Sequence, residues 1–193
     1  MNKLVAELFS NDTERIAKAE SRLLKIRNPD SSLITALLPL ATSRNFHAWC
    51  AAMAILSRFR GRKEIGRYLL RRLRGGDSYE REWAAHALAD IPFEGSLNTL
   101  TRYANSSKNL KIRAASLGAL IKLLRQFPRC KEHVRGIFEK ASRSSAAQIR
   151  AVGFGGLVEM HDPKYDKRIR KTLCDRDPTI RKVLAPAWTE CSG

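Results

Sequence analysis

The sequence carries few of the residue patterns that mark metal or redox chemistry. Its four cysteines (Cys50, Cys130, Cys174 and Cys191) are scattered and form no CxxC pair, which argues against a disulfide framework and against a zinc site. None of its four histidines has a second histidine or a carboxylate at a metal-binding helical spacing such as HExxH. There is also no glycine-rich phosphate loop. We therefore expect no metal, no cofactor, and reduced thiols in a cytoplasmic protein.

Long apolar runs are missing as well. The longest extends from Leu33 to Ala41, is interrupted by Thr35 and Pro39, and is too short to cross a bilayer. The first ten residues, MNKLVAELFS, include the acid Glu7 and lack the apolar core of a secretory signal. The sequence therefore predicts neither a membrane span nor a secretory leader.

Carboxylates are scarce relative to cations. The chain has 36 Lys and Arg against 19 Asp and Glu, a formal net charge of +17. Such an excess favours an acidic partner, which could be a protein or a nucleic acid. Charge that is scattered evenly would only keep the surface solvated, so what matters is whether the cations gather on one face.

A repeated segment organises the chain. KIRAASLGAL (111–120) has related copies at QIRAVGFGGL (148–157), TIRKVLAPAW (179–188), REWAAHAL (81–88), AWCAAMAIL (48–56) and IAKAESRLL (16–24). The copies end at positions separated by 32, 32, 32, 37 and 31 residues, namely Leu24, Leu56, Leu88, Leu120, Leu157 and Trp188. A near-constant period of this length is typical of a solenoid. The longer step predicts an insertion around 125–131 or 142–146.

The segments between the copies read as second helices. Apolar residues recur at helical spacing in 31–41, 62–74, 94–104, 129–141 and 163–174, and no stretch alternates long enough to predict a strand. We expect an all-α fold, a right-handed solenoid of about six antiparallel helix pairs with the last one incomplete. Residues 1–193 are expected to form one such domain. The small residues of each copy should let stacked helices approach closely, and its arginine should reach acidic or carbonyl groups of a neighbouring repeat.

DPTIR (177–181), KIRAASLGAL and QIRAVGFGGL resemble the first helix of HEAT repeats, especially the short bacterial kind found in phycobilisome lyases. The resemblance covers about residues 12–188. It implies that the first helix of each pair lies on the convex side and that the second lines the concave side. It implies no single function, because HEAT repeats are a class of scaffold.

Cations gather on the second helices. Aligning these helices by their apolar stripes makes Leu69, Leu100, Ile137 and Ile169 equivalent. The positions two before and two after are four residues apart and therefore share a face. Apart from Asn98 and Glu139 they are all basic. With the flanking Arg74, the predicted partner-binding residues are Arg67, Arg71, Arg74, Arg102, Arg135, Lys167 and Lys171.

One enzyme class combines helical repeats with a basic concave surface, namely the HEAT-like DNA glycosylases that remove alkylated bases. These also use an acid and tryptophans near the damaged nucleotide. Glu139 is the one acid within the predicted basic surface, and it is the only catalytic candidate. Trp49, Trp83 and Trp188 fall on first helices, where packing or capping is the commoner role. The sequence does not contain the full constellation, so a non-catalytic role is favoured.

The favoured function is a binding scaffold whose basic concave surface docks an acidic partner protein, as an adaptor, a regulator or an inhibitor. DNA or RNA binding through phosphate neutralisation is the alternative, and charge alone does not separate the two. The last repeat stops after its first helix, so we also expect a C-terminal cap or a dimer contact at Trp188.

Overall fold

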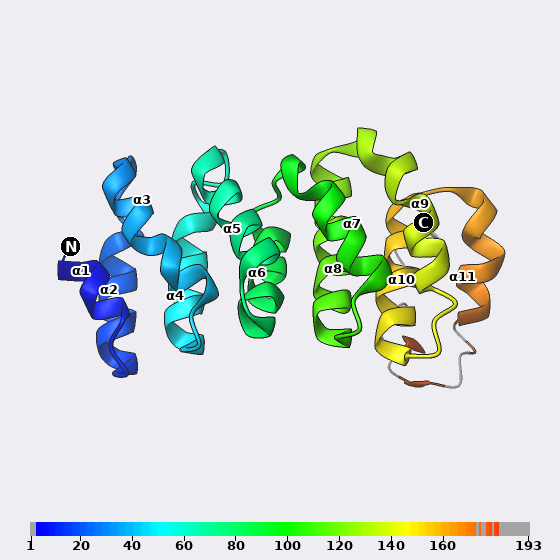
Figure 1. The fold of residues 1–193 in the computed structure, drawn as a ribbon, viewed down its shortest axis with the longest axis horizontal. Helices are drawn as coiled ribbons and strands as arrows, with labels where there is room; N and C mark the ends of the chain where they lie inside the picture. The colour runs from blue at the N-terminus through cyan, green and yellow to red at the C-terminus, as the bar shows by residue number, and fades with distance from the viewer. Residues whose placement is uncertain (1–2, 173, 175–176, 179, 182–193) are drawn as a thin grey trace. The chain divides into compact units, whose positions relative to one another are not determined.

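The computed structural model describes residues 3–172, 174, 177, 178, 180 and 181, and all regular elements among them are helical (Figure 1). The chain divides into two compact units, Met1–Ser96 and Leu97–Gly193. The fold is an all-α helical-repeat solenoid, as the sequence predicts. That residues 1–193 act as one domain stays a prediction, as does the right-handed twist. None of the described helices has the length and apolar character of a membrane span.

The first unit contains six α-helices and two short 3₁₀ turns. They are α1 (Lys3–Leu8), α2 (Thr13–Leu23), α3 (Ser31–Leu37), η1 (Leu38–Thr42), α4 (Phe46–Ser57), α5 (Lys63–Gly75), α6 (Ser78–Asp90) and η2 (Glu94–Ser96). Helix α4 contacts both α2 and α6, while α5 packs on α6 and contacts η2. Similar helices thus lie side by side, as in a solenoid.

The second unit repeats this arrangement. It contains α7 (Leu97–Ser106), α8 (Leu110–Gln126), η3 (Pro128–Cys130), α9 (Lys131–Ala141), α10 (Ala147–Glu159), η4 (Pro163–Tyr165) and α11 (Asp166–Thr172). Helix α8 lies against α10, α7 contacts α9, and α11 contacts α10. The predicted C-terminal cap or dimer contact at Trp188 lies outside the described residues.

The closest helix pairs begin one helix earlier than the sequence copies suggest. Extensive contacts join α1 to α2, α5 to α6, α7 to α8 and α9 to α10, and α8 contacts α10 as extensively. The connections inside these pairs are short; only Gly76 and Asp77 separate α5 from α6. A short connection forces the next helix to fold back on the previous one. Helix α1, which the repeat pattern does not predict, is thereby the partner of α2.

In four of the repeats, the first helix begins with a side-chain cap at an equivalent position. Asp12, Asn45, Asp77 and Asn109 are the N-caps of α2, α4, α6 and α8, and each accepts hydrogen bonds from backbone N–H groups of the first turn. These bonds satisfy donors that have no partner within the helix. Helix α10 begins after Ala146, which cannot cap in this way. The 37-residue step includes the 17-residue α8, which ends at Gln126, and the five-residue connection 142–146, one of the two predicted places of the insertion.

Some small residues and one arginine of the copies have the contacts that the sequence predicts. A Cβ on Gly153 would lie 2.4 Å from the backbone nitrogen of Ser142, and one on Gly156 would lie 2.1 Å from the ring of Phe138. These glycines therefore let α10 approach α9. Arg113 of α8 donates from Nε to the carbonyl oxygen of Ala104 in α7 at 2.9 Å. The arginine thus links neighbouring helices through a carbonyl group.

Candidate partner-binding surface

Three predicted partner-binding residues share the exposed face of α5. The opposite face of this helix buries Ile65, Tyr68, Leu69 and Leu73 in the core of the first unit. Arg67, Arg71 and Arg74 follow one another at four- and three-residue spacing and are all exposed. Their charges therefore lie along one stripe of the helix.

A pocket of about 360 Å³ adjoins the last turn of α5. It is lined by Tyr68, Arg71, Arg72, Gly75 and Gly76. The guanidinium carbons of Arg71 and Arg72 lie 6.0 and 5.3 Å from the centroid of the Tyr68 ring. The Arg72 distance is typical of a cation–π contact, and the Arg71 distance is at the outer limit. The sequence predicts Arg71 as a binding residue but not the pocket, because only the turn into α6 brings Arg72 and the two glycines together with it.

Glu80 of α6 holds two parts of this pocket in place through hydrogen bonds. Its Oε1 lies 3.0 Å from an Nη of Arg72, and its Oε2 accepts a hydrogen bond from the backbone nitrogen of Asp77 at 3.1 Å. Arg72 also donates from Nε to the Tyr68 hydroxyl oxygen at 3.0 Å. This bond and the nearby Glu80 raise the pKa of Arg72. Arg72 is therefore a fixed, already neutralised wall of the pocket.

In the second unit the predicted cations fall on three helices. Arg102 of α7 is exposed, and its guanidinium carbon lies 5.1 Å from the centroid of the Tyr103 ring. Lys167 and Lys171 of α11 are exposed and line a pocket of about 600 Å³. Pro163, Asp166, Arg170 and Cys174 complete that lining. Arg102, Lys167 and Lys171 form no ion pair with any described carboxylate.

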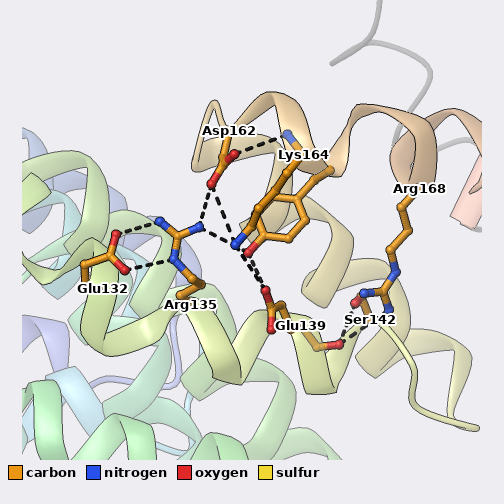
Figure 2. Close-up of polar contacts among 8 residues, drawn as sticks. Glu132, Arg135, Glu139, Ser142, Asp162, Lys164 and Arg168 are labelled. Atoms are coloured by element: carbon orange, nitrogen blue, oxygen red, sulfur yellow. Dashed lines mark hydrogen bonds and ion pairs between the residues drawn. The ribbon is translucent and has the colours of Figure 1, made fainter.

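Arg135 of α9, unlike the exposed cations of the other helices, is surrounded by carboxylate partners (Figure 2). Its Nη atoms lie 2.6 Å from Glu132 Oε1 and 2.5 Å from Asp162 Oδ2, and one of them donates to the Tyr165 hydroxyl at 3.3 Å. The guanidinium holds the pKa of both carboxyl groups below their usual range, and they raise its own pKa. Its side chain is only 21% exposed. Most of its hydrogen-bonding capacity is therefore used inside the unit.

Glu139 belongs to the same network and does not pair with Arg135. The Tyr165 hydroxyl donates to Glu139 Oε1 at 2.5 Å, and Lys164 Nζ lies 3.6 Å from the same oxygen (Figure 2). The tyrosine hydrogen bond, with Lys164 nearby, lowers the pKa of Glu139. A carboxylate held in its ionised form is a poor general acid. Tyr165 is itself buried, so it offers no ring for stacking on a base.

Trp49 and Trp83 belong to the first unit and pack within it. Trp49 of α4 and Trp83 of α6 pack against each other with ring centroids 4.6 Å apart, and Trp49 Nε1 donates to the carbonyl oxygen of Ala41. Both are therefore packing residues of the first helices, as predicted. Within the part of the chain that the structure describes, no group of histidine, cysteine and carboxylate side chains could hold a metal ion.

The fold is shared with solved structures of helical-repeat proteins. Importin beta aligns over 98% of this chain and 29% of its own, with a TM-score of 0.72 and 16% identity. Kap95p, from a complex with RanGDP, aligns over 96% of this chain with a TM-score of 0.66 and 15% identity. The chain spans only 25% of that protein. The CpcE–CpcF phycocyanin lyase of Nostoc sp. aligns over 94% of this chain and 73% of its own, with a TM-score of 0.59 and 18% identity.

These proteins are HEAT- or ARM-repeat solenoids, and at such identities the similarity establishes the fold alone. No known protein family and no curated protein matches the sequence significantly.

Proposed function

We propose that this protein is a non-catalytic binding scaffold that docks an acidic partner protein on the basic faces of its second helices. We also assign it to the HEAT repeats of the phycobilisome-lyase kind and place it in the cytoplasm. The observation that carries the proposal is the stripe of exposed arginines on α5, formed by Arg67, Arg71 and Arg74. Arg102, Lys167 and Lys171 supply similar exposed cations in the second unit.

Two further observations support a protein partner. Similar solenoids are known in protein complexes, as Kap95p with RanGDP and CpcE with CpcF. Glu139, the catalytic candidate of the glycosylase alternative, accepts a hydrogen bond from the Tyr165 hydroxyl and lies 3.6 Å from Lys164 Nζ. The nucleic-acid alternative rests on the charge of +17 alone.

Affinity capture from the native cell extract, with and without nuclease, tests the proposal. An acidic protein should remain bound after nuclease treatment. The double variant Arg71→Glu with Lys171→Glu should abolish its capture and leave the helical circular dichroism spectrum unchanged, because exposed charges contribute little to folding. Arg15→Glu with Arg22→Glu, which changes exposed charges of α2 by the same amount, is the matched control.

The salt dependence of binding distinguishes an acidic protein partner from a nucleic acid. A protein partner held partly by apolar contacts should resist salt and unrelated DNA. Binding that falls steeply and linearly with the logarithm of salt concentration would instead indicate phosphate contacts. If the Arg71→Glu, Lys171→Glu variant binds as well as the wild type, the positive charge only solvates the surface.

A further inference from the structure

The pocket at the end of α5 holds one positive charge that nothing in the structure balances. Of its two arginines, Arg72 lies 3.0 Å from the carboxylate of Glu80 and is neutralised by it. Arg71 forms no ion pair with any residue that the structure describes, and only its contact with the Tyr68 ring orients it. The pocket therefore presents a net charge of about +1 to a ligand.

The pocket also contains an unused hydrogen-bond donor. Tyr68 is 9% exposed, and its hydroxyl oxygen accepts the Nε–H of Arg72. A phenol has one O–H donor in addition to its acceptor sites. Among the described residues nothing accepts that hydrogen. Because buried polar groups are normally satisfied, this donor is available to a group that enters the pocket.

The pocket is shaped before any ligand arrives. A Cβ on Gly76 would lie 2.6 Å from the carbonyl oxygen of Arg72 and 2.7 Å from Glu80, so the chain can turn this tightly only with glycine there. Glu80 fixes both Arg72 and the first turn of α6. Such preorganisation lowers the cost of ordering side chains on binding.

We propose that this pocket is a binding site for a side-chain carboxylate of the acidic partner, held by the Arg71 guanidinium and the Tyr68 hydroxyl. The inference rests on the proposed function and names the residues that anchor the partner. A singly charged carboxylate matches the single unbalanced charge, and arginine binds carboxylates through two parallel hydrogen bonds. A phosphate dianion fits less well, because its second negative charge would have no matching positive charge in the pocket.

Calorimetric titration with a deca-glutamate peptide tests the site, with deca-glutamine as the uncharged control. We expect Arg71→Ala and Tyr68→Phe each to weaken deca-glutamate binding by about tenfold, the effect of losing a hydrogen bond to a charged group. Tyr68→Phe keeps the ring and removes only the hydroxyl. Arg67→Ala, four residues before Arg71 on the exposed face and outside the pocket, is the matched control and should weaken binding only about twofold.

Each result decides between the claims. If deca-glutamate binds but Tyr68→Phe binds as tightly as the wild type and Arg71→Ala loses no more than Arg67→Ala, the pocket is not the site and the basic surface still stands. If the wild type binds deca-glutamine as well as deca-glutamate, both this inference and the proposed function are wrong. Thermal unfolding of each variant shows whether a loss reflects misfolding.

A measurement on the arginine side chains identifies the anion directly and does not depend on variants. In the ¹H–¹⁵N spectrum of the arginine Nε–H groups, added acetate should shift the Arg71 signal and leave that of Arg67 unchanged. Inorganic phosphate should shift Arg71 less than acetate at equal ionic strength. Tighter binding of phosphate than of acetate would overturn the carboxylate assignment, and equal shifts at Arg71 and Arg67 would overturn the site.

Discussion

Helices α5 and α9 occupy equivalent places in two repeats, one in each unit, yet they are joined to the structure that follows them in different ways. In the first unit the ring of Phe93 covers Gly66 of α5, so that a Cβ on this glycine would lie only 2.4 Å from the ring. In the second unit Arg135 and Glu139 of α9 bind Asp162 and Tyr165, which precede and end η4. We call these two sets of contacts joints. The joint between Gly66 and Phe93 is apolar, and the joint of Arg135 and Glu139 with Asp162 and Tyr165 is ionic.

This difference explains why similar basic positions serve different ends. Arg67 and Arg135 are equivalent in the alignment of the second helices. Where an aromatic ring closes the joint, Arg67 is left exposed to solvent. Where the joint is built from charges, Arg135 is mostly covered and already paired. The basic positions of a repeat are therefore available to a partner only where packing does not need them.

The largest effect should come from filling the apolar joint. Gly66→Ala places a methyl group within 2.4 to 2.7 Å of three Phe93 side-chain atoms. Overpacking of this kind should lower the free energy of unfolding by roughly 1–3 kcal/mol. Gly136→Ala is the matched control on α9, because nothing lies within 4 Å of its Cβ position. It should instead stabilise the protein by about 0.5–1 kcal/mol, since alanine favours a helix interior. Urea denaturation measures both.

The ionic joint should respond to loss of its central cation. Arg135→Gln leaves the carboxylates of Glu132 and Asp162 without their main partner, and we expect a lower midpoint of thermal unfolding. Arg67→Gln, at the equivalent exposed position, should leave the midpoint unchanged. Binding should show the reverse order, with Arg67→Gln weakening capture of an acidic partner more than Arg135→Gln. Equal midpoints for the two variants would contradict the distinction between the joints.

Acid should weaken the ionic joint in a predictable direction. Arg135 lowers the pKa of Asp162 and Glu132 in the folded protein below the ordinary values of 3.8 and 4.5. Their contribution to stability is therefore fully present above the ordinary values and is lost as the pH falls through the lowered ones. Wild type should lose stability below about pH 4 more steeply than Arg135→Gln, in which the pKa values are closer to normal. Urea midpoints of both proteins at pH 7 and pH 3 measure the difference. Parallel profiles would rule out a role for Arg135.

The sequence predicted the repeats well because their signals are local. The structure has helices where the sequence shows helical periodicity, at the spacing of the repeated copies, and it has close helix contacts at Gly153 and Gly156. The joints were not predictable, because they depend on residues about 27 positions apart. Nothing in the local pattern of α9 shows that Asp162 neutralises Arg135. Likewise Arg72 and Glu80 become neighbours only through the tight turn at Gly76, so the pocket beside Tyr68 was missed.

The smallest effect is expected at Glu139, and it decides whether the ionic joint also has a catalytic role. Glu139→Gln keeps an oxygen that can accept the Tyr165 hydrogen bond but removes the charge near Lys164. Its side chain is 33% exposed, so the change in stability should be small. Partner binding should be unchanged or slightly tighter, because the substitution removes a negative charge from a basic helix. A base-excision assay on alkylated DNA should find no activity in either protein. Excision by the wild type that Glu139→Gln abolishes would establish the glycosylase alternative and replace the scaffold proposal.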